Sequence, residues 1–357
     1  MAPIRFSAED CLAALWGVTG TDLIIVPGTA PRMRVDGQLV PVPGAPRLAP
    51  EDTEAILRSL LTQDQWLEFT DGDLDFSFTW RDLARIRGNA YRQRGSIAIV
   101  LRMMPNKIPS FDDLGLPQAV REFAKLSQGV VLVTGPTGSG KSTTLASLVD
   151  WINHNRAVHI LTIEDPIEYV HWHKKAMITQ RSIGEDADSF ATALRSAMRE
   201  DPDILLVGEL RDQESIGFAI SMAKTGHLVF ATLHTTGTVS TVDRLLDAFP
   251  IDQQNQVRMQ LSGLLTGVVY QRLLPRIGGG QVGAFEVLIA NTAIRTLIRD
   301  SKTNQIRNEL QLGAREGMQT LENSLNQLIA DGLITYEDAL ARTDYPREIV
   351  SAPPAGR

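Results

Sequence analysis

Apolar positions in the first hundred residues switch between helical and extended spacing. Ser7-Ala8-Glu9-Asp10 is typical of a helix N-terminus, and apolar residues follow it at helical spacing through Trp16. Residues 50–69 are amphipathic and predict one longer helix. Segments 74–80 and 97–103 place an apolar side chain at every second position, as strands do. A short strand is expected at 23–26, and residues 32–40 predict a hairpin that turns at Asp36-Gly37. Together these elements predict an α+β domain over residues 1–104.

A polar, proline-containing stretch then interrupts the pattern. Pro105-Asn106-Lys107-Ile108-Pro109 predicts an extended interdomain linker, with bounds of 105–116. Beyond it, helix-like segments alternate with continuous apolar runs, which lie at 130–134, 158–163, 204–207 and 228–233. Such runs are typical of strands buried on both faces of a parallel sheet. They predict an α/β domain over 117–345, starting with a helix at 117–126.

The pattern changes again after Gly263. Residues 268–289 predict a hairpin around three consecutive glycines, and helical spacing returns at 293–299, 305–312 and 321–330. Thr335 has the position of a cap on one last helix. The α/β domain therefore ends in a helical C-terminal part, and the proline-containing residues 346–357 predict a disordered tail.

The run 130–134 is followed by a glycine-rich loop whose residues are suited to bind phosphate. Gly135-Pro136-Thr137-Gly138-Ser139-Gly140-Lys141-Ser142-Thr143 matches G-x-x-x-x-G-K-S and precedes a helix-like segment. Glycines allow backbone N–H groups to turn toward a phosphate, and the following helix presents its positive end. Lys141 can reach the β- and γ-phosphates, and the Ser142 hydroxyl can bind Mg²⁺. We expect a nucleoside triphosphate with Mg²⁺ here.

Polar residues follow three of the other apolar runs. Glu164 comes after 158–163, Glu209 after 204–207, and His234 after 228–233. Because the carboxyl ends of parallel strands share one edge of a sheet, these side chains should converge near the phosphate loop. We expect Glu164 and Glu209 to serve hydrolysis, with the identity of the base left open. His234 is expected to contact the γ-phosphate or Glu209. Taken singly, each could instead be an ordinary loop acid or a structural histidine.

Two groups of arginines are candidate phosphate ligands. Arg195 and Arg199 stand four residues apart on a helix expected over 190–200, which places both on one face. Five more arginines lie near the end of the first domain, at Arg85, Arg87, Arg92, Arg94 and Arg102. From the residues alone, either group could bind phosphate or form a solvated charged face.

Bulk composition excludes several classes of protein. The chain has 357 residues, 43% hydrophobic and 22% charged, with a formal charge of −7, so its net charge gives sequence-independent nucleic-acid binding no electrostatic basis, and only a local basic patch formed by folding would provide one. Cys11 is the single cysteine, which excludes an intramolecular disulfide and a cysteine-built zinc module. Neither a signal peptide nor an apolar stretch long enough to span a membrane is found. We therefore expect a cytoplasmic protein that reaches a membrane only through partners.

Four ordered blocks resemble one enzyme family. They are the phosphate loop 135–143, an Asp box at 162–171, a Walker B block at 193–212 and a His box at 226–236. Together they closely resemble the secretion ATPase superfamily and, within it, the type IV pilus retraction ATPases. Residues 293–300, AIRTLIRD, resemble a block associated with retraction, from which Thr296 and Asp300 depart. Thr21-Asp22-Leu23 lacks the histidine that usually follows Asp-Leu.

The resemblance implies a fold, a cofactor and partners. It implies a PAS-like first domain, a RecA-like ATPase domain, ATP with Mg²⁺ bound, and a homohexameric ring. First-domain arginines of a neighbouring subunit, here Arg87, Arg94 and Arg102, would then contact phosphate. Glu164 matches the family's water-activating carboxylate and Glu209 its Walker B carboxylate, with Gly208 in place of the usual aspartate. An inner-membrane pilus platform protein and a second retraction ATPase are the implied partners, placing the protein peripherally at the inner membrane.

Three other functions remain alternatives. One is an accessory pilus ATPase or a type II/IV secretion-system ATPase. A second is a nucleic-acid motor of RecA or helicase type, because a shared core sheet does not fix function. The third is a nucleotide-binding regulator without turnover.

Overall fold

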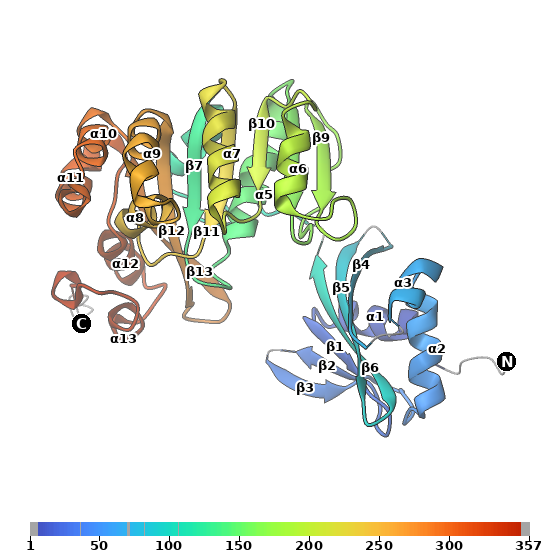
Figure 1. Cartoon of the computed structure of the whole chain (residues 1–357). Helices are drawn as coiled ribbons and strands as arrows, with labels where there is room; N and C mark the ends of the chain where they lie inside the picture. The colour runs from blue at the N-terminus through green and yellow to red at the C-terminus, as the bar shows by residue number, and fades with distance from the viewer. Residues whose placement is uncertain (1–5, 36, 70–71, 82, 106, 351–357) are drawn as a thin grey trace, which may run out of the picture. The chain divides into compact units, whose positions relative to one another are not determined.

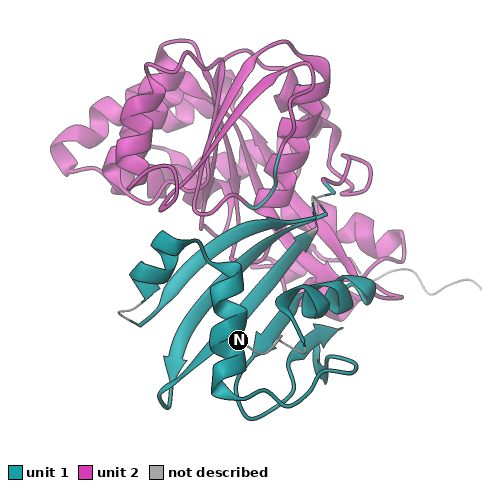
Figure 2. Cartoon of the chain, turned by 90° about the vertical axis from the view of Figure 1, so that its right-hand side faces the viewer, with its two compact units in different colours: residues 1–107, 168–170 teal, residues 108–167, 171–357 magenta. Residues whose placement is uncertain are grey.

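The computed structural model describes residues 6–35, 37–69, 72–81, 83–105 and 107–350 of the chain. They form two compact units, shown in different colours in Figure 2. Unit 1 spans residues 1–107 with 168–170, and unit 2 spans 108–167 with 171–357. Asp36 of the expected hairpin turn, Asn106 of the expected linker and residues 351–357 of the expected tail lie outside the described residues.

Unit 1 is built on a six-stranded antiparallel sheet in the order β3-β2-β1-β6-β5-β4. Its strands are β1 Asp22–Ile25, β2 Arg32–Val35, β3 Gln38–Pro41, β4 Leu74–Trp80, β5 Ala84–Gln93 and β6 Ser96–Pro105. Helices α1 Ala8–Gly17 and α2 Pro50–Leu60 supply apolar side chains to a core that also takes every second residue of β6. Alternation in the sequence thus identified the buried face of this sheet.

Two details of unit 1 differ from the sequence prediction. The helix expected over 50–69 is two helices, α2 and α3 Gln63–Glu68, because Leu61 is extended and Thr62 caps a new helix with Gln65 in a capping box. Strand β5 was not predicted at all. Its buried positions include Ala84, Gly88 and Ala90, whose small side chains give little hydrophobic alternation.

Unit 2 contains a seven-stranded sheet in the order β13-β12-β7-β11-β10-β8-β9. Its strands are β7 Gly129–Thr134, β8 His159–Glu164, β9 Met177–Ser182, β10 Ile204–Val207, β11 Leu228–Leu233, β12 Leu265–Pro275 and β13 Gln281–Ile289. Neighbouring strands are parallel except β12 and β13, which form the expected hairpin. The four continuous apolar runs are the central strands β7, β8, β10 and β11, whose side chains fill cores on both faces.

Helices cover both faces of this sheet (Figure 1). They are α4 Gln118–Glu122, α5 Lys141–Asn155, α6 Phe190–Ala197, α7 Gln213–Lys224, α8 Thr238–Asp247 and α9 Ile251–Leu264. Apolar residues of α4 and α5 pack on one face, and those of α6, α7 and α9 pack on the other. The helix expected from Pro117 to residue 126 ends sooner, with α4 followed by a 3₁₀ turn, Phe123–Lys125.

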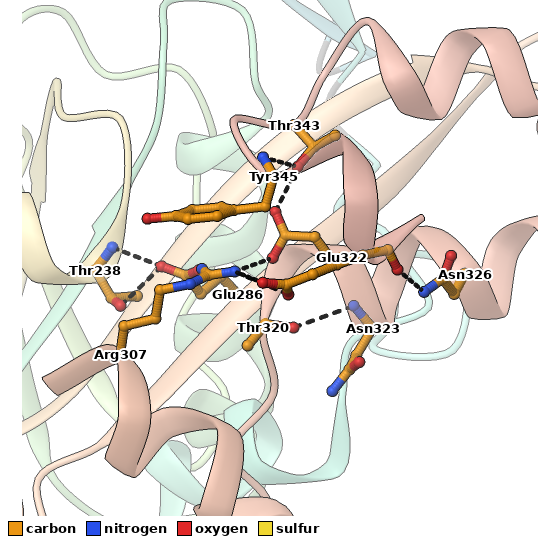
Figure 3. A network of polar contacts seen from close by, with 10 residues as sticks. Thr238, Glu286, Arg307, Thr320, Glu322, Asn323, Asn326, Thr343 and Tyr345 are labelled. Atoms are coloured by element: carbon orange, nitrogen blue, oxygen red, sulfur yellow. Dashed lines mark hydrogen bonds and ion pairs between the residues drawn. The ribbon is translucent and has the colours of Figure 1, made fainter. Parts of the chain in front are cut away.

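The C-terminal part is helical, with α10 Thr292–Arg299, α11 Ile306–Leu312, α12 Leu321–Ala330 and α13 Tyr336–Leu340. Arg307 of α11 bonds Glu322 of α12 at 3.0 Å and Glu348 at 2.9 Å, while the Tyr345 ring lies 3.4 Å from its guanidinium (Figure 3). Disorder was therefore wrongly predicted for the start of the tail. Pro346–Glu348 form a 3₁₀ helix and Ile349 is buried, since the network and a small apolar core hold this segment.

In the part of the chain that the structure describes, helices are too short or too polar to cross a membrane.

Candidate nucleotide site

The phosphate loop joins the buried strand β7 to the long helix α5. Gly140, in a left-handed conformation, is the N-cap of α5, and no side chain caps the helix. The first-turn N–H groups are therefore available to an external acceptor. Gly135 has a φ of +144°, and a Cβ there would lie 2.4 Å from the carbonyl oxygen of Gln271, so only glycine fits. The Ser139 hydroxyl is buried without a hydrogen-bond partner in the described residues. An anion held by the loop would supply one.

Lys141 lies at the centre of this loop. Its ammonium donates to the carbonyl oxygens of Gly135 and Pro136, both at 3.0 Å, and lies 3.5 Å from Nδ1 of His234. Ser142 follows it in the first turn of α5 and is half-buried. The donor set of backbone N–H groups, one ammonium and one hydroxyl fits the phosphates of a nucleotide and the Mg²⁺ bound to them.

Glu209 and His234 lie beside each other at the carboxyl ends of β10 and β11. Nε2 of His234 is 3.4 Å from Oε1 of Glu209, and Nε of Arg211 donates to Oε2 of Glu209 at 2.8 Å. The Arg211 guanidinium also lies 3.8 Å from Asp165. Its hydrogen bond with Glu209 raises the pKa of Arg211. The expected proximity of His234 to Glu209 is therefore present, and His234 connects Glu209 to Lys141.

Glu164 ends strand β8 beside β10. Its Oε1 accepts a hydrogen bond from the Thr162 hydroxyl at 2.7 Å and from the Gln180 amide at 3.3 Å. On the neighbouring strand end, a Cβ at Gly208 would lie 3.2 Å from Cα of Glu164. The usual Walker B aspartate therefore has no room here unless the end of β8 shifts. Glu209 stands one residue further along the chain.

The structure places Arg195 and Arg199 differently from the sequence prediction. Helix α6 ends at Ala197, so the two arginines do not share one helical face. Arg195 lies 3.6 Å from Glu214 of α7, and both arginines are exposed. The helix was expected to continue to Glu200 because its apolar spacing continues, but the backbone turns at Met198 ahead of β10. Among the described residues, neither arginine forms a hydrogen bond or an ion pair with the phosphate loop.

The three arginines of the first domain that were expected to contact phosphate, Arg87, Arg94 and Arg102, belong to the sheet of unit 1. Arg102 of β6 pairs with Asp22 at 2.9 Å, and Arg87 of β5 stands directly opposite Arg102 in the strand register. Arg94 occupies the turn between these strands with a φ of +49°. All three side chains are exposed. The three arginines therefore stand on one antiparallel strand pair, β5 and β6. The sequence showed that they cluster along the chain but not that their strands pair.

Sequence reasoning missed several residues of the site. Thr162 is the first residue of the Asp box, but it also lies within an apolar run and was given no role of its own. Gln180 belongs to β9, an edge strand that was not predicted because its sequence is polar and partly exposed. Gln271 accepts a hydrogen bond from Thr144 at 2.7 Å and so ties α5 to β12. Arg211 could have been found, because it directly follows the Walker B block's Glu209-Leu210.

Together the fold and the site define a P-loop nucleotide-hydrolysing enzyme. Residues 70–331 match the family described as Type II/IV secretion system protein. The chain belongs to this family, and it is an ATPase.

Named relatives and solved structures give the same assignment. The type IV pilus retraction ATPase PilT of Pseudomonas aeruginosa is 44% identical over 91% of this chain and 95% of its own length. The twitching motility protein of Neisseria gonorrhoeae is 46% identical over 87% of this chain and 84% of its own length. The crystal structure of the pilus retraction motor PilT with bound ADP superposes with a TM-score of 0.91, at 46% identity, covering 97% of this chain and 99% of the other.

Proposed function

We propose that this chain is an ATP-driven motor that powers the retraction of type IV pili. The observation that carries the proposal is the connected set Lys141, His234 and Glu209 at one sheet edge, in a chain similar over nearly its whole length to retraction ATPases. The P-loop supports nucleotide binding, and the relatives named for retraction and twitching support the mechanical role.

The residues of unit 2 have distinct proposed roles in hydrolysis. ATP with Mg²⁺ supplies, when bound, the phosphoryl group and the metal charge. Lys141 and the N–H groups of the loop 135–143 hold the phosphates, with Ser142 on the metal. Glu164 and Glu209 orient the attacking water, and one of the two takes its proton, while His234 contacts the γ-phosphate or Glu209. Lys141 must leave the carbonyl oxygens of Gly135 and Pro136 to make these contacts.

We propose further that the active form is a homohexamer. Arg87, Arg94 and Arg102 of one subunit would then add positive charge to the phosphates bound by a neighbour. Their exposure on one strand pair supports a role outside the core of unit 1. Arg195 and Arg199, also exposed, are retained as candidates of the same kind.

The proposed partners follow from the proposed role. A retraction motor would act on an inner-membrane pilus platform protein, so the chain would lie in the cytoplasm, peripheral to that membrane. A second retraction ATPase is a further proposed partner. The chain is itself 37% identical, over 92% of its length, to the type IV pilus ATPase PilU of Pseudomonas aeruginosa.

Gene deletion tests the mechanical role. Loss of twitching with surface pili retained or increased is the result expected for a retraction motor. Loss of pili would contradict retraction and indicate assembly. Twitching that persists would indicate an accessory or secretion-system ATPase. ATPase activity that requires DNA would instead indicate a nucleic-acid motor.

A further inference from the structure

Two donors from neighbouring strands meet at one oxygen of Glu164. The Thr162 hydroxyl reaches Oε1 at 2.7 Å, and the Gln180 amide reaches the same atom at 3.3 Å. Thr162 and Gln180 are direct partners in the register of the parallel strands β8 and β9. Glu164 lies two residues beyond Thr162, hence on the same face of β8. The strand pairing therefore builds a fixed cradle for this carboxylate.

The orientation of the Gln180 amide is set by a third group. Its Oε1 accepts a hydrogen bond at 2.7 Å from the backbone N–H of His171, which can only donate. The amide nitrogen must therefore face Glu164, and the opposite orientation would leave two donors facing each other. His171 belongs to the same Asp box as Glu164, so Gln180 connects the two ends of that motif. Gln180 itself lies outside the four motif blocks.

We propose that Thr162 and Gln180 are positioning residues that hold Glu164 in its reactive orientation and keep it ionised. This inference rests on the proposed role of Glu164 in water activation. Two donors on one carboxylate oxygen favour the charged form and restrict rotation of the side chain. A fixed carboxylate can accept a water proton without first reorganising.

The charges around Glu164 determine how the cradle acts. Asp165 and Glu209 lie on the same edge of the sheet and disfavour a further negative charge. Arg211 lies between those two acids, at 2.8 Å from Glu209 and 3.8 Å from Asp165, and is committed to them. The hydrogen bonds that Thr162 and Gln180 donate to Glu164 favour its charged form and so oppose the repulsion from the nearby acids.

Single substitutions in the full-length protein test the proposal. Thr162→Val removes the hydroxyl with little change of shape, and Gln180→Met removes the amide. Each should lower kcat for ATP on the order of tenfold, as for one lost hydrogen bond to a charged group, with KM for ATP almost unchanged. The acidic limb of the kcat–pH profile should move to higher pH, because the charged form of Glu164 loses a donor. Mere structural damage would not move that limb.

Matched controls separate positioning from general damage. Thr162→Ser keeps the hydroxyl and should restore kcat and the pH profile. Thr179→Val alters the same strand as Gln180 but removes a hydroxyl that contacts His159 at 3.0 Å instead, so kcat should stay at the wild-type value. Binding of a fluorescent ATP analogue identifies any variant that fails to fold.

Three outcomes distinguish the possible failures. Wild-type kcat and pH profiles in both Thr162→Val and Gln180→Met, with Glu164→Gln inactive, would overturn the positioning roles and leave the proposed function standing. Full turnover in Glu164→Gln would remove the role of Glu164 and, with it, this inference. Absence of turnover in the wild-type protein would contradict the ATPase itself.

Discussion

Burial of His171 makes the stability of unit 2 depend on pH. The side chain is 8% exposed, and its Nδ1 has no hydrogen-bond partner in the described residues. Burial lowers its pKa from 6.5 to about 4, while Asp150 acts in the opposite direction and Lys174 adds to the lowering. His171 is therefore neutral in the folded protein at pH values where the unfolded chain already binds a proton.

The sign and size of the effect follow from these two pKa values. Because the folded pKa is the lower one, stability is complete above about pH 6.5 and falls as the pH drops toward 4. A difference of about 2.5 pKa units, at about 1.4 kcal/mol per unit, sets a limit of about 3.5 kcal/mol. Between pH 8 and pH 5 the expected loss is about 2 kcal/mol.

Urea unfolding at both pH values measures this loss. The substitution His171→Phe keeps a ring and removes the titrating group, so the difference in stability between pH 8 and pH 5 should shrink by about 2 kcal/mol relative to wild type. The comparison cancels contributions from other groups. Trp172→Phe, at an exposed neighbouring position, should keep the wild-type pH dependence. Equal pH dependence of wild type and His171→Phe would refute the reasoning.

Three further predictions concern single residues elsewhere. Cys11 is fully buried, and burial raises its pKa to about 12. The native thiol should therefore not react with dithionitrobenzoate at pH 8, whereas the thiol of the unfolded chain should react fully. Rapid labelling of the native protein would contradict this prediction. Gly208→Ala should lower kcat for ATP and cost about 1–3 kcal/mol of stability, since its Cβ would press on the end of β8. An unchanged kcat together with an unchanged free energy of unfolding would show that the strand end has room for the methyl group. Arg307→Met should lower the free energy of unfolding in urea by about 3 kcal/mol, because it leaves the buried carboxylate of Glu322 on α12 without its cation. Glu348→Gln alters a partly exposed partner of Arg307 and should cost less than about 1 kcal/mol. Similar losses in the two variants would be inconsistent with the difference in burial.

The sequence predicts the centre of unit 2 well because strong local signals coincide there. The runs at 204–207 and 228–233 are strands with those same bounds, since continuous apolar residues need burial on both faces. Glycine spacing identified the phosphate loop, because the backbone at Gly135 and Gly140 approaches Gln271 too closely for a side chain. Placement of Glu209 and His234 then followed from the shared edge of parallel strands.

Other features depend on tertiary contacts that leave little trace in the sequence. Strand β9 pairs at the edge of the sheet and needs no apolar run, so Gln180 could not be placed near Glu164. The break at Leu61 was marked only by Thr62 and Gln65, a capping pair within an otherwise helical pattern. The ordered conformation of residues 346–349 depends on the ion pair of Glu348 with Arg307, some forty residues earlier in the chain.

ATP turnover by wild type and Glu209→Gln tests the central claim most directly. The amide matches the carboxylate in shape but lacks its negative charge, so it cannot orient the attacking water in the same way, and turnover should fall by about a hundredfold or more while ATP binding is retained. Lys141→Ala, by contrast, should lose ATP binding. The predicted result is an active wild type and an inactive Glu209→Gln protein that still binds ATP. Equal turnover in the two proteins, or negligible turnover in both, would contradict a hydrolytic site built on the phosphate loop, His234 and Glu209.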